Sequence, residues 1–340
     1  MADIQTLIEQ NNAARQDLHQ KTAAELIKAW QQVDPGNIRA SWEEQVPQAS
    51  ALVATAQLDA ATLQTEFIGS ALAEQGLAAE GPGVIPKSFS GISYPLHGGQ
   101  TALTLAEYMQ APTMITLGAI KAGADVNRSL AAGLANLLLR GQRQVSDASR
   151  MAGSVSMSSR RRRYGFVRTL APPSCSRCAI LAGKWYRANA NFDRHPGCDC
   201  SQVPASKAKA EELTTDPYEY FSSLSPAEQK RLFTEAGAKA INDGADIFQV
   251  VNARRGMYTS TGGSKVTYEG VTKRGFYGWS QTEFQKTPES KYKRAVKQRM
   301  MPEEIYKRAK GNKDREIALL QEYGYITGIG QNPNGVIRFG

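Results

Sequence analysis

All four cysteines of this 340-residue chain lie between residues 175 and 200, together with one of its three histidines. Cys175 and Cys178 form a Cys-x2-Cys pair, and a second group, His195, Cys198 and Cys200, begins after 16 intervening residues. A Cys-x2-Cys turn lets two thiolates reach one ion, and a second group brought back by a short hairpin completes a tetrahedron. The spacing therefore predicts structural zinc. It does not decide which of His195, Cys198 and Cys200 is left out of the coordination.

Two other interpretations of the cysteine cluster are weaker. Disulfides form in oxidising compartments, and the polar start of the chain lacks the basic and apolar regions of a secretory signal peptide. Inert buried thiols belong in an apolar core, whereas Pro, Gly, Arg, Asp and Lys are frequent around these cysteines. We therefore expect a reducing compartment and a zinc ion that holds together a small fold.

The sequence lacks the motifs of common zinc and serine enzymes. A zinc deaminase carries His-x-Glu and Pro-Cys-x-x-Cys, but here two glycines follow His97 and Ser174 precedes Cys175. His-Glu-x-x-His, Gly-x-Ser-x-Gly, the P-loop and Gly-x-Gly-x-x-Gly are also absent. His19 falls in a polar helical segment, so His97 is the only histidine left as a candidate base. We predict a protein that is not an enzyme, with an unusual protease site as the open alternative.

A run of arginines just before the cysteine cluster forms a second candidate site. The net charge is −4 over residues 1–150, +7 over 151–205 and +6 over the rest. A compact basic patch with aromatic residues can hold nucleic-acid phosphates without reading the sequence, although a charge run can also be a solvated loop. The candidate nucleic-acid-binding residues are Arg160, Arg161, Arg162, Arg163 and Arg168.

Apolar residues at helical spacing predict long helices in the first half of the chain. They cover residues 4–30, 38–73 and a stretch from about 101 to 151, with Pro47 marking a kink or boundary in the second. Residues 81–99 are dense in Gly, Pro and Ser and predict an irregular connection. A short strand over residues 166–170 leads into the cysteine cluster.

The second half of the chain mixes helical and extended signals. Ser225, Pro226 and Glu228 form a capping box that opens a helix, and residues 301–326 predict a helix pair. The motif VNARRG at residues 251–256 is more typical of a helix that ends on its glycine than of a basic contact motif. Residues 256–290 are rich in Gly, Thr, Ser and Tyr, which predicts an extended arm or hairpin rather than a packed domain.

These segments predict a mainly α (α+β) protein with three parts. Residues 1–158 form a helical domain, 159–206 a basic, zinc-stapled hairpin module, and 207–340 an extended C-terminal arm with helices. No stretch of about 18 apolar residues occurs in the sequence, so no membrane span and no membrane partner are expected.

The segment FVRTLAPPSCSRCAILAGKWYRANANFDRHPGCDC resembles the MuF-like minor capsid proteins, also called head morphogenesis proteins, of tailed bacteriophages. The PPSCSRCAILAG form and the later NARRG are similar to members from phages of actinobacteria. One residue departs from the family: Asp199 stands where a basic residue is common, which weakens any role of that step in gripping phosphate. The residues that carry the resemblance are Cys175, Cys178, Leu181, Gly183, Trp185 or Tyr186, His195, Pro196, Cys198 and Cys200.

The resemblance implies a structural protein inside the phage head, in the virion. Such proteins are present in few copies near the portal and are thought to aid head assembly, genome packaging or ejection. The implied partners are the portal protein, the major capsid or scaffolding protein, and packaged double-stranded DNA held without sequence specificity. Some relatives are described as capsid maturation proteases, which is the first alternative function. A zinc-dependent nucleic-acid-binding protein is the second.

Overall fold

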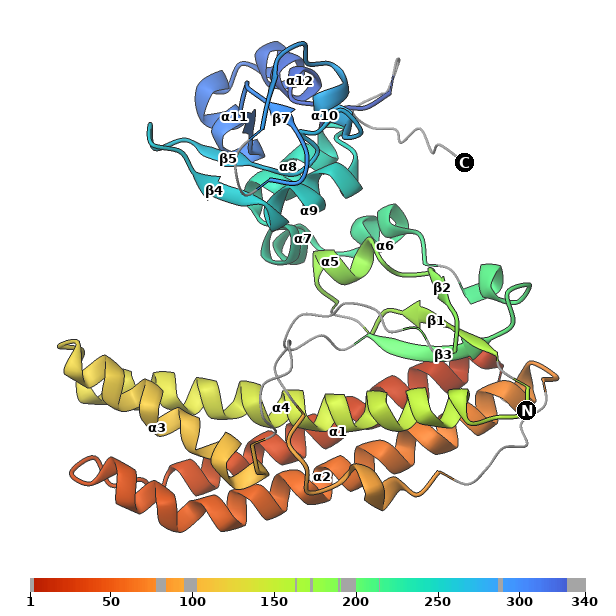
Figure 1. The fold of residues 1–340 in the computed structure, drawn as a ribbon, viewed down its shortest axis with the longest axis vertical. Helices are drawn as coiled ribbons and strands as arrows, with labels where there is room; N and C mark the ends of the chain where they lie inside the picture. Colours follow the sequence, from red (N-terminus) through yellow and green to blue (C-terminus); the bar gives the residue numbers. More distant parts are fainter. Residues whose placement is uncertain are drawn as a thin grey trace. The chain divides into compact units, whose positions relative to one another are not determined.

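The chain forms two compact units in a computed structural model that describes residues 3–77, 84–94, 103–162, 164–171, 174–188, 190, 200–213, 215–286 and 290–328. The first unit comprises Met1–Pro172 and Gly183–Thr214, and the second comprises Pro173–Ala182 and Thr215–Gly340. Helices dominate, with small antiparallel sheets, so the predicted mainly α (α+β) class is confirmed (Figure 1). The chain is grouped differently from the three predicted parts, because residues 159–206 are shared between the two units.

The first unit is built on long helices that pack side by side (Figure 1). The predicted segments 4–30 and 38–73 are confirmed to within one residue at each end, and the second helix continues through Pro47. The single stretch predicted from about 101 to 151 is instead two helices that are separated at residues 122–125, and the second of them continues to Ser158. The elements are α1 (Ile4–Trp30), α2 (Ile38–Glu74), the short 3-10 helix η1 (Pro86–Phe89), α3 (Leu105–Lys121) and α4 (Val126–Ser158).

Local capping and an aromatic core explain why these helices begin where they do and how they pack. Thr104 caps α3 in a reciprocal box with Glu107, which satisfies free backbone N–H groups of the first turn. Trp30 and Trp42 meet edge to face with ring centres 4.9 Å apart in the buried core. The Trp42 indole donates a 2.9 Å hydrogen bond to the Met109 carbonyl, so no polar group of this side chain is lost to burial.

A three-stranded antiparallel sheet covers one end of the helices of the first unit. It has the order β2–β1–β3, with β1 (Gly165–Thr169), β2 (Trp185–Tyr186) and β3 (Ser201–Ala205), followed by the 3-10 helix η2 (Ala210–Leu213). The predicted strand over 166–170 is therefore confirmed with a shift of one residue. Phe166 and Val203 of the sheet share one buried cluster with Phe67 and Ile68 of α2. This shared core explains why the sheet belongs to the helical unit.

The second unit consists of short helices around a small sheet. The predicted capping box is confirmed at Ser225 and Glu228, which open α7. The helices are α5 (Ser176–Ala179), α6 (Pro217–Ser223), α7 (Pro226–Phe233), α8 (Glu235–Asn242), α9 (Ile247–Arg255), α10 (Phe276–Trp279), α11 (Pro302–Ala309) and α12 (Lys313–Glu322). The strands are β4 (Met257–Thr259), β5 (Lys265–Thr267) and β8 (Arg299–Met300), which form one sheet, and the pair β6 (Phe284–Gln285) and β7 (Arg294–Ala295).

Residues 256–290 do not form a separate arm. Strands β4 and β5 pair with each other, and β5 also pairs with β8, which lies more than 30 residues further along the chain. Val266 of β5 is 2% exposed and Tyr277 of α10 is fully buried. Strands β4 and β5 form a hairpin, so the hairpin alternative of the prediction is confirmed and the unpacked arm is wrong. Thr259 and Thr267 lie in these strands, and apolar residues of the segment supply part of the core.

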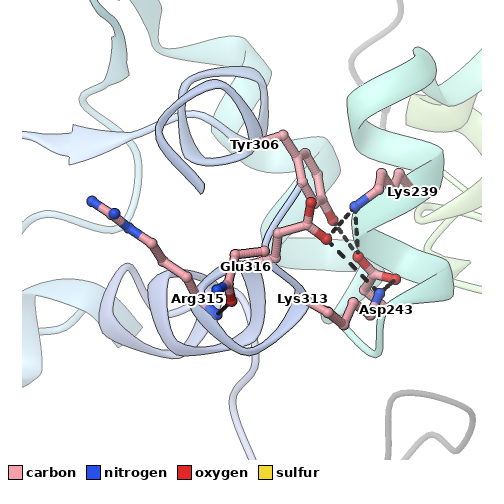
Figure 2. A network of polar contacts seen from close by, with 7 residues as sticks. Lys239, Asp243, Tyr306, Lys313, Arg315 and Glu316 are labelled. Carbon is pink, nitrogen blue, oxygen red and sulfur yellow. Dashed lines mark hydrogen bonds and ion pairs between the residues drawn. The ribbon is translucent and has the colours of Figure 1, made fainter. Parts of the chain in front are cut away.

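A charged network joins α8 to α11 and α12 (Figure 2). Lys239 lies 2.5 Å from Glu316 and 3.3 Å from Asp243, and its ammonium sits 3.7 Å from the centre of the Tyr306 ring. Asp243 also accepts hydrogen bonds from Lys313 and, at 2.8 Å, from the Tyr306 hydroxyl. Burial opposes ionisation of Asp243, but these hydrogen bonds outweigh it and lower the pKa of the carboxyl. The network therefore holds the almost fully buried Asp243 carboxyl in the charged form.

Candidate metal centre and basic surface

The Cys-x2-Cys pair forms a compact turn in the second unit. Cys175 is the N-cap of α5, and the backbone N–H of Cys178 donates to its sulfur at 3.4 Å. The two sulfur atoms are 3.4 Å apart. Tetrahedral zinc with Zn–S bonds of about 2.3 Å requires sulfurs about 3.8 Å apart. The pair therefore fits a metal ion that takes two ligands from this turn.

Tyr220 of α6 fixes the residue that precedes the Cys-x2-Cys turn. Its hydroxyl donates to the Ser174 carbonyl at 2.7 Å and accepts from the Ser174 N–H at 2.8 Å. Burial raises the pKa of the Tyr220 phenol, and negative charge on Cys175 and Cys178 acts in the same direction. The phenol stays protonated, so it can both donate and accept beside the two thiols.

The turn is also anchored to the NARRG segment, whose sequence predicts the end of a helix. Arg177, between the two cysteines, donates to the Asn252 side chain of α9 at 2.5 Å. The two arginines of NARRG form ion pairs within the second unit: Arg254 contacts Glu303, and Arg255 donates to Glu269 at 2.8 Å. The predicted helix terminus at Gly256 is confirmed. NARRG therefore connects elements of the second unit, and its basic groups are engaged in ion pairs.

Cys200 is the one remaining candidate ligand that the structure describes. Cys200 is 1% exposed and belongs to the first unit, directly before β3. His195 and Cys198 lie outside the described residues. Within the described ranges no group of three or more His, Cys, Asp and Glu side chains gathers, and these ranges contain three of the five candidates. The thiols at 175 and 178 are the pair whose geometry can be compared with a zinc site.

The arginine run divides into buried and exposed members. Arg168 of β1 is fully buried and Arg160 is 8% exposed, so neither side chain lies where a nucleic-acid phosphate could reach it. Arg160 and Arg168 are therefore not candidates for contacts with nucleic-acid phosphates. Arg161 and Arg162 are exposed, and Arg163 lies outside the described part of the chain. The sequence does not indicate this division, because all five arginines lie close together between residues 160 and 168, ahead of the cysteine cluster.

Replacing Arg161 and Arg162 with glutamine is expected to weaken non-specific DNA binding and to reduce the salt slope by about two, because each phosphate contact releases about one counterion. Fluorescence anisotropy with duplex DNA at several salt concentrations measures both effects. Lys121→Gln with Arg128→Gln removes the same charge from exposed positions elsewhere in the first unit. Equal losses in the two double variants would show that only the overall charge matters.

One serine–histidine contact was not foreseen from the sequence. Ser146 of α4 lies 3.2 Å from Nε2 of His19 in α1, within a buried polar layer of the first unit. Ser146 is 2% exposed, and Nδ1 of His19 has no partner among the described residues to orient the ring. A serine nucleophile needs substrate access and an oriented base. The contact has neither, so it joins two helices rather than forming a protease dyad.

This histidine makes the stability of the first unit depend on pH. Burial, reinforced by the charges of Arg15 and Arg150, lowers the pKa of His19 from 6.5 to about 4. The unfolded chain then binds a proton that the folded unit does not, so stability is complete above pH 6.5 and falls as the pH drops toward 4. The expected loss is about 3 kcal/mol.

His19→Gln should remove this part of the pH dependence while keeping a polar side chain next to Ser146. The pH dependence of stability is measured by hydrogen exchange of α1 and α4 peptides in the full chain. The measurement runs between pH 4 and 7 and is corrected for intrinsic exchange rates. The other two histidines stay in both proteins, so the difference isolates His19. If the stability of the wild-type chain changes with pH in the same way as that of His19→Gln, His19 is not the source of this pH dependence.

Comparison of the chain with protein-family models, curated proteins and solved structures finds no match. Among the helices of the described ranges, none combines the length and apolar character needed to cross a membrane.

Proposed function

We propose that this chain is a structural minor capsid protein of a tailed bacteriophage, located inside the head near the portal. It resembles the MuF-like proteins in the segment from Cys175 to Cys200, and this resemblance carries the proposal. The geometry of the Cys175–Cys178 turn supports it, because two converging thiols suit the structural zinc that the motif implies. The contact of Arg177 with Asn252 adds support, since it joins the two segments that are similar to the family.

The proposed role is to assist head assembly and the packaging or ejection of DNA. The portal protein and the major capsid or scaffolding protein are its proposed protein partners. Arg161 and Arg162 are the proposed contacts to packaged double-stranded DNA, because they are the exposed members of the arginine run. Zinc is proposed as a structural cofactor that two thiolates from Cys175 and Cys178 help to hold, with further ligands from the segment 195–200.

Quantitative mass spectrometry of purified mature particles tests the proposal. The expected result is a low, fixed number of intact copies relative to the portal protein. Absence from the particles, together with new cut ends on capsid or scaffolding proteins, would favour the capsid maturation protease instead. Absence from particles without any cleavage would favour a nucleic-acid-binding protein of the host cell.

A further inference from the structure

A cavity of about 380 Å³ lies in the second unit, among β4, β5 and the β6–β7 pair. Its volume is within the range of sites that bind small molecules. The wall combines apolar side chains, among them Val271, Ala295 and Val296, with several polar ones. No Asp or Glu occurs among the described residues that line the cavity, so this part of the wall contributes no carboxylate.

Arg294 of β7 brings a positive charge to the cavity wall. Its guanidinium lies over the Tyr268 ring, 4.6 Å from the ring centre, and this ring is itself stacked on Tyr258 with centres 4.0 Å apart. The ring holds the guanidinium in place but uses none of its N–H groups in a conventional hydrogen bond, because a ring face offers no oxygen or nitrogen acceptor. No carboxylate in the described ranges pairs with Arg294. Its N–H groups are therefore available to an anion.

The second cation of the described wall already has a partner. Lys297 lies 2.5 Å from Glu322, and this hydrogen bond raises the pKa of the Lys297 ammonium. Glu322 is not among the residues that line the cavity, so the ion pair is made outside it. The described wall therefore offers a ligand one unpaired positive charge.

Gln285 of β6 adds a neutral donor beside Arg294. The two residues are directly opposite in the β6–β7 pair, so their side chains leave the same face of the pair, and both line the cavity. The Gln285 amide has no hydrogen-bond partner among the described residues. Two other polar groups of the wall are in use, because Gln298 donates to the Tyr258 hydroxyl at 3.3 Å and Ser290 donates to a backbone carbonyl at 2.6 Å. The guanidinium and this amide thus remain to meet a ligand.

We infer that this cavity binds a small monocarboxylate, with the carboxylate on Arg294 and Gln285 and a short apolar body against Val271 and Val296. One guanidinium balances the single charge of a carboxylate and can form two parallel hydrogen bonds with it. A phosphate monoester carries about −1.5 to −2 at pH 7 and would be left partly unbalanced. Both a free organic acid and the C-terminal residue of a peptide have the inferred chemistry. The inference does not depend on the proposed capsid role, because it concerns residues outside the family-like segments.

Binding is measured on the full chain by ligand-observed NMR titration, which detects weak complexes. The probes are 3-methylbutanoate, its neutral amide, inorganic phosphate, and an acetylated tetrapeptide that ends in valine. We expect 3-methylbutanoate or the peptide to bind at least tenfold more tightly than the amide and more tightly than phosphate. Binding of 3-methylbutanoate identifies a free acid as a ligand, and binding of the peptide alone identifies a peptide C-terminus. Equal binding of the amide or of phosphate, or no binding of either carboxylate, would overturn the inference.

Single substitutions test the two donors. Arg294→Gln should weaken carboxylate binding about tenfold or more, and Gln285→Ala about threefold, because hydrogen bonds to a charged donor are the stronger ones. Arg294→Lys should retain part of the binding, since it keeps the charge but loses the planar fork, and this separates loss of the site from loss of the fold. Arg231→Gln, which removes an exposed charge on α7, is the matched control. A loss in this control equal to that of Arg294→Gln would overturn the assignment.

Glu289→Gln completes the series. Glu289 lies outside the described residues, but in the sequence it directly precedes Ser290 of the cavity wall. The wild-type chain and Glu289→Gln should bind the carboxylate probes with similar affinity. Binding that appears only in Glu289→Gln would assign this carboxylate to Arg294 as an internal partner and would overturn the inference.

Discussion

Replacing Cys175 and Cys178 together with serine is expected to abolish zinc binding by the purified chain. Serine is similar in size to cysteine, and its oxygen can replace the Cys175 sulfur as the cap of the turn, but a hydroxyl is not deprotonated at neutral pH and is a poor zinc ligand. Zinc content should fall from one ion per chain to background, and substituted cobalt should lose its thiolate absorption. Ser176→Ala, in the same turn, is the control and should keep the ion. A double variant that retains one zinc per chain would contradict the metal assignment.

The same measurements can identify the other ligands. His195→Ala, Cys198→Ser and Cys200→Ser are compared one at a time, and the residue whose loss leaves zinc content and cobalt spectrum unchanged is not a ligand. In zinc-finger peptides the binding energy of such an ion is about 10 kcal/mol or more, and there it is the folding energy. The present turn has two contacts that need no metal, Tyr220 with Ser174 and Arg177 with Asn252. In the double serine variant we therefore expect faster hydrogen exchange near residues 175 and 178, while α6 and α9 stay protected from exchange.

Local signals predicted several elements of both units well. The apolar spacing in α1, the pattern of β1 and the capping box at Ser225 each involve residues within one or two turns or strands, so a single sequence contains the whole signal. Pro47 is an instructive exception. It breaks one backbone hydrogen bond, yet α2 continues through it because Trp42, Val46 and other residues on both sides are buried in the same core.

Contacts between distant residues could not be predicted. Arg177 and Asn252 are 75 positions apart, and neither residue type nor spacing indicates that they meet. The same holds for His19 and Ser146, which are 127 positions apart. Arg168 shows the opposite failure: an arginine beside a basic run is usually solvated, but the central strand of a sheet buries it completely. Composition misled the prediction for residues 256–290, because turn residues outnumber the few apolar residues that reach the core.

Replacing Arg299 with methionine is expected to open the C-terminal part of the second unit. Arg299 is 1% exposed, and burial lowers the pKa of its guanidinium. It donates to the carbonyls of Tyr323 and Gly324 at 2.8 and 2.9 Å, where α12 ends and its unpaired carbonyls favour a cation. It also donates to the Glu269 carbonyl and the Gln249 side chain, both at 3.1 Å. One side chain thus joins β8 to the end of α12, to Glu269 two residues after β5, and to α9.

The substitution leaves buried acceptors without donors, and each costs about 1–3 kcal/mol. Methionine also removes the cost of burying a charge, which offsets part of this loss. We therefore expect the free energy of opening to fall by about 3 kcal/mol, which corresponds to about hundredfold faster exchange of amides in β8 and α12. Exchange is measured by mass spectrometry on the full chain, where peptides of the first unit should not change. The exchange rates of Arg299→Lys should fall between those of Arg299→Met and the wild type, because an ammonium keeps the charge but cannot reach all of the same acceptors.

Arg308→Met is the matched control for this experiment. Arg308 lies in the same unit and pairs with Glu304 at 2.9 Å, but its side chain is 46% exposed, so its loss should cost less than about 1 kcal/mol. Gly270→Ala gives an independent test, because a Cβ at this position would lie 2.6 Å from Nη1 of Arg299 and the backbone has a φ of +73°. It should speed exchange in the same peptides without removing a donor. If Arg299→Met behaves like Arg308→Met, the guanidinium is not what holds α12 in place, and the apolar contacts of Leu320 and Tyr325 must do so instead.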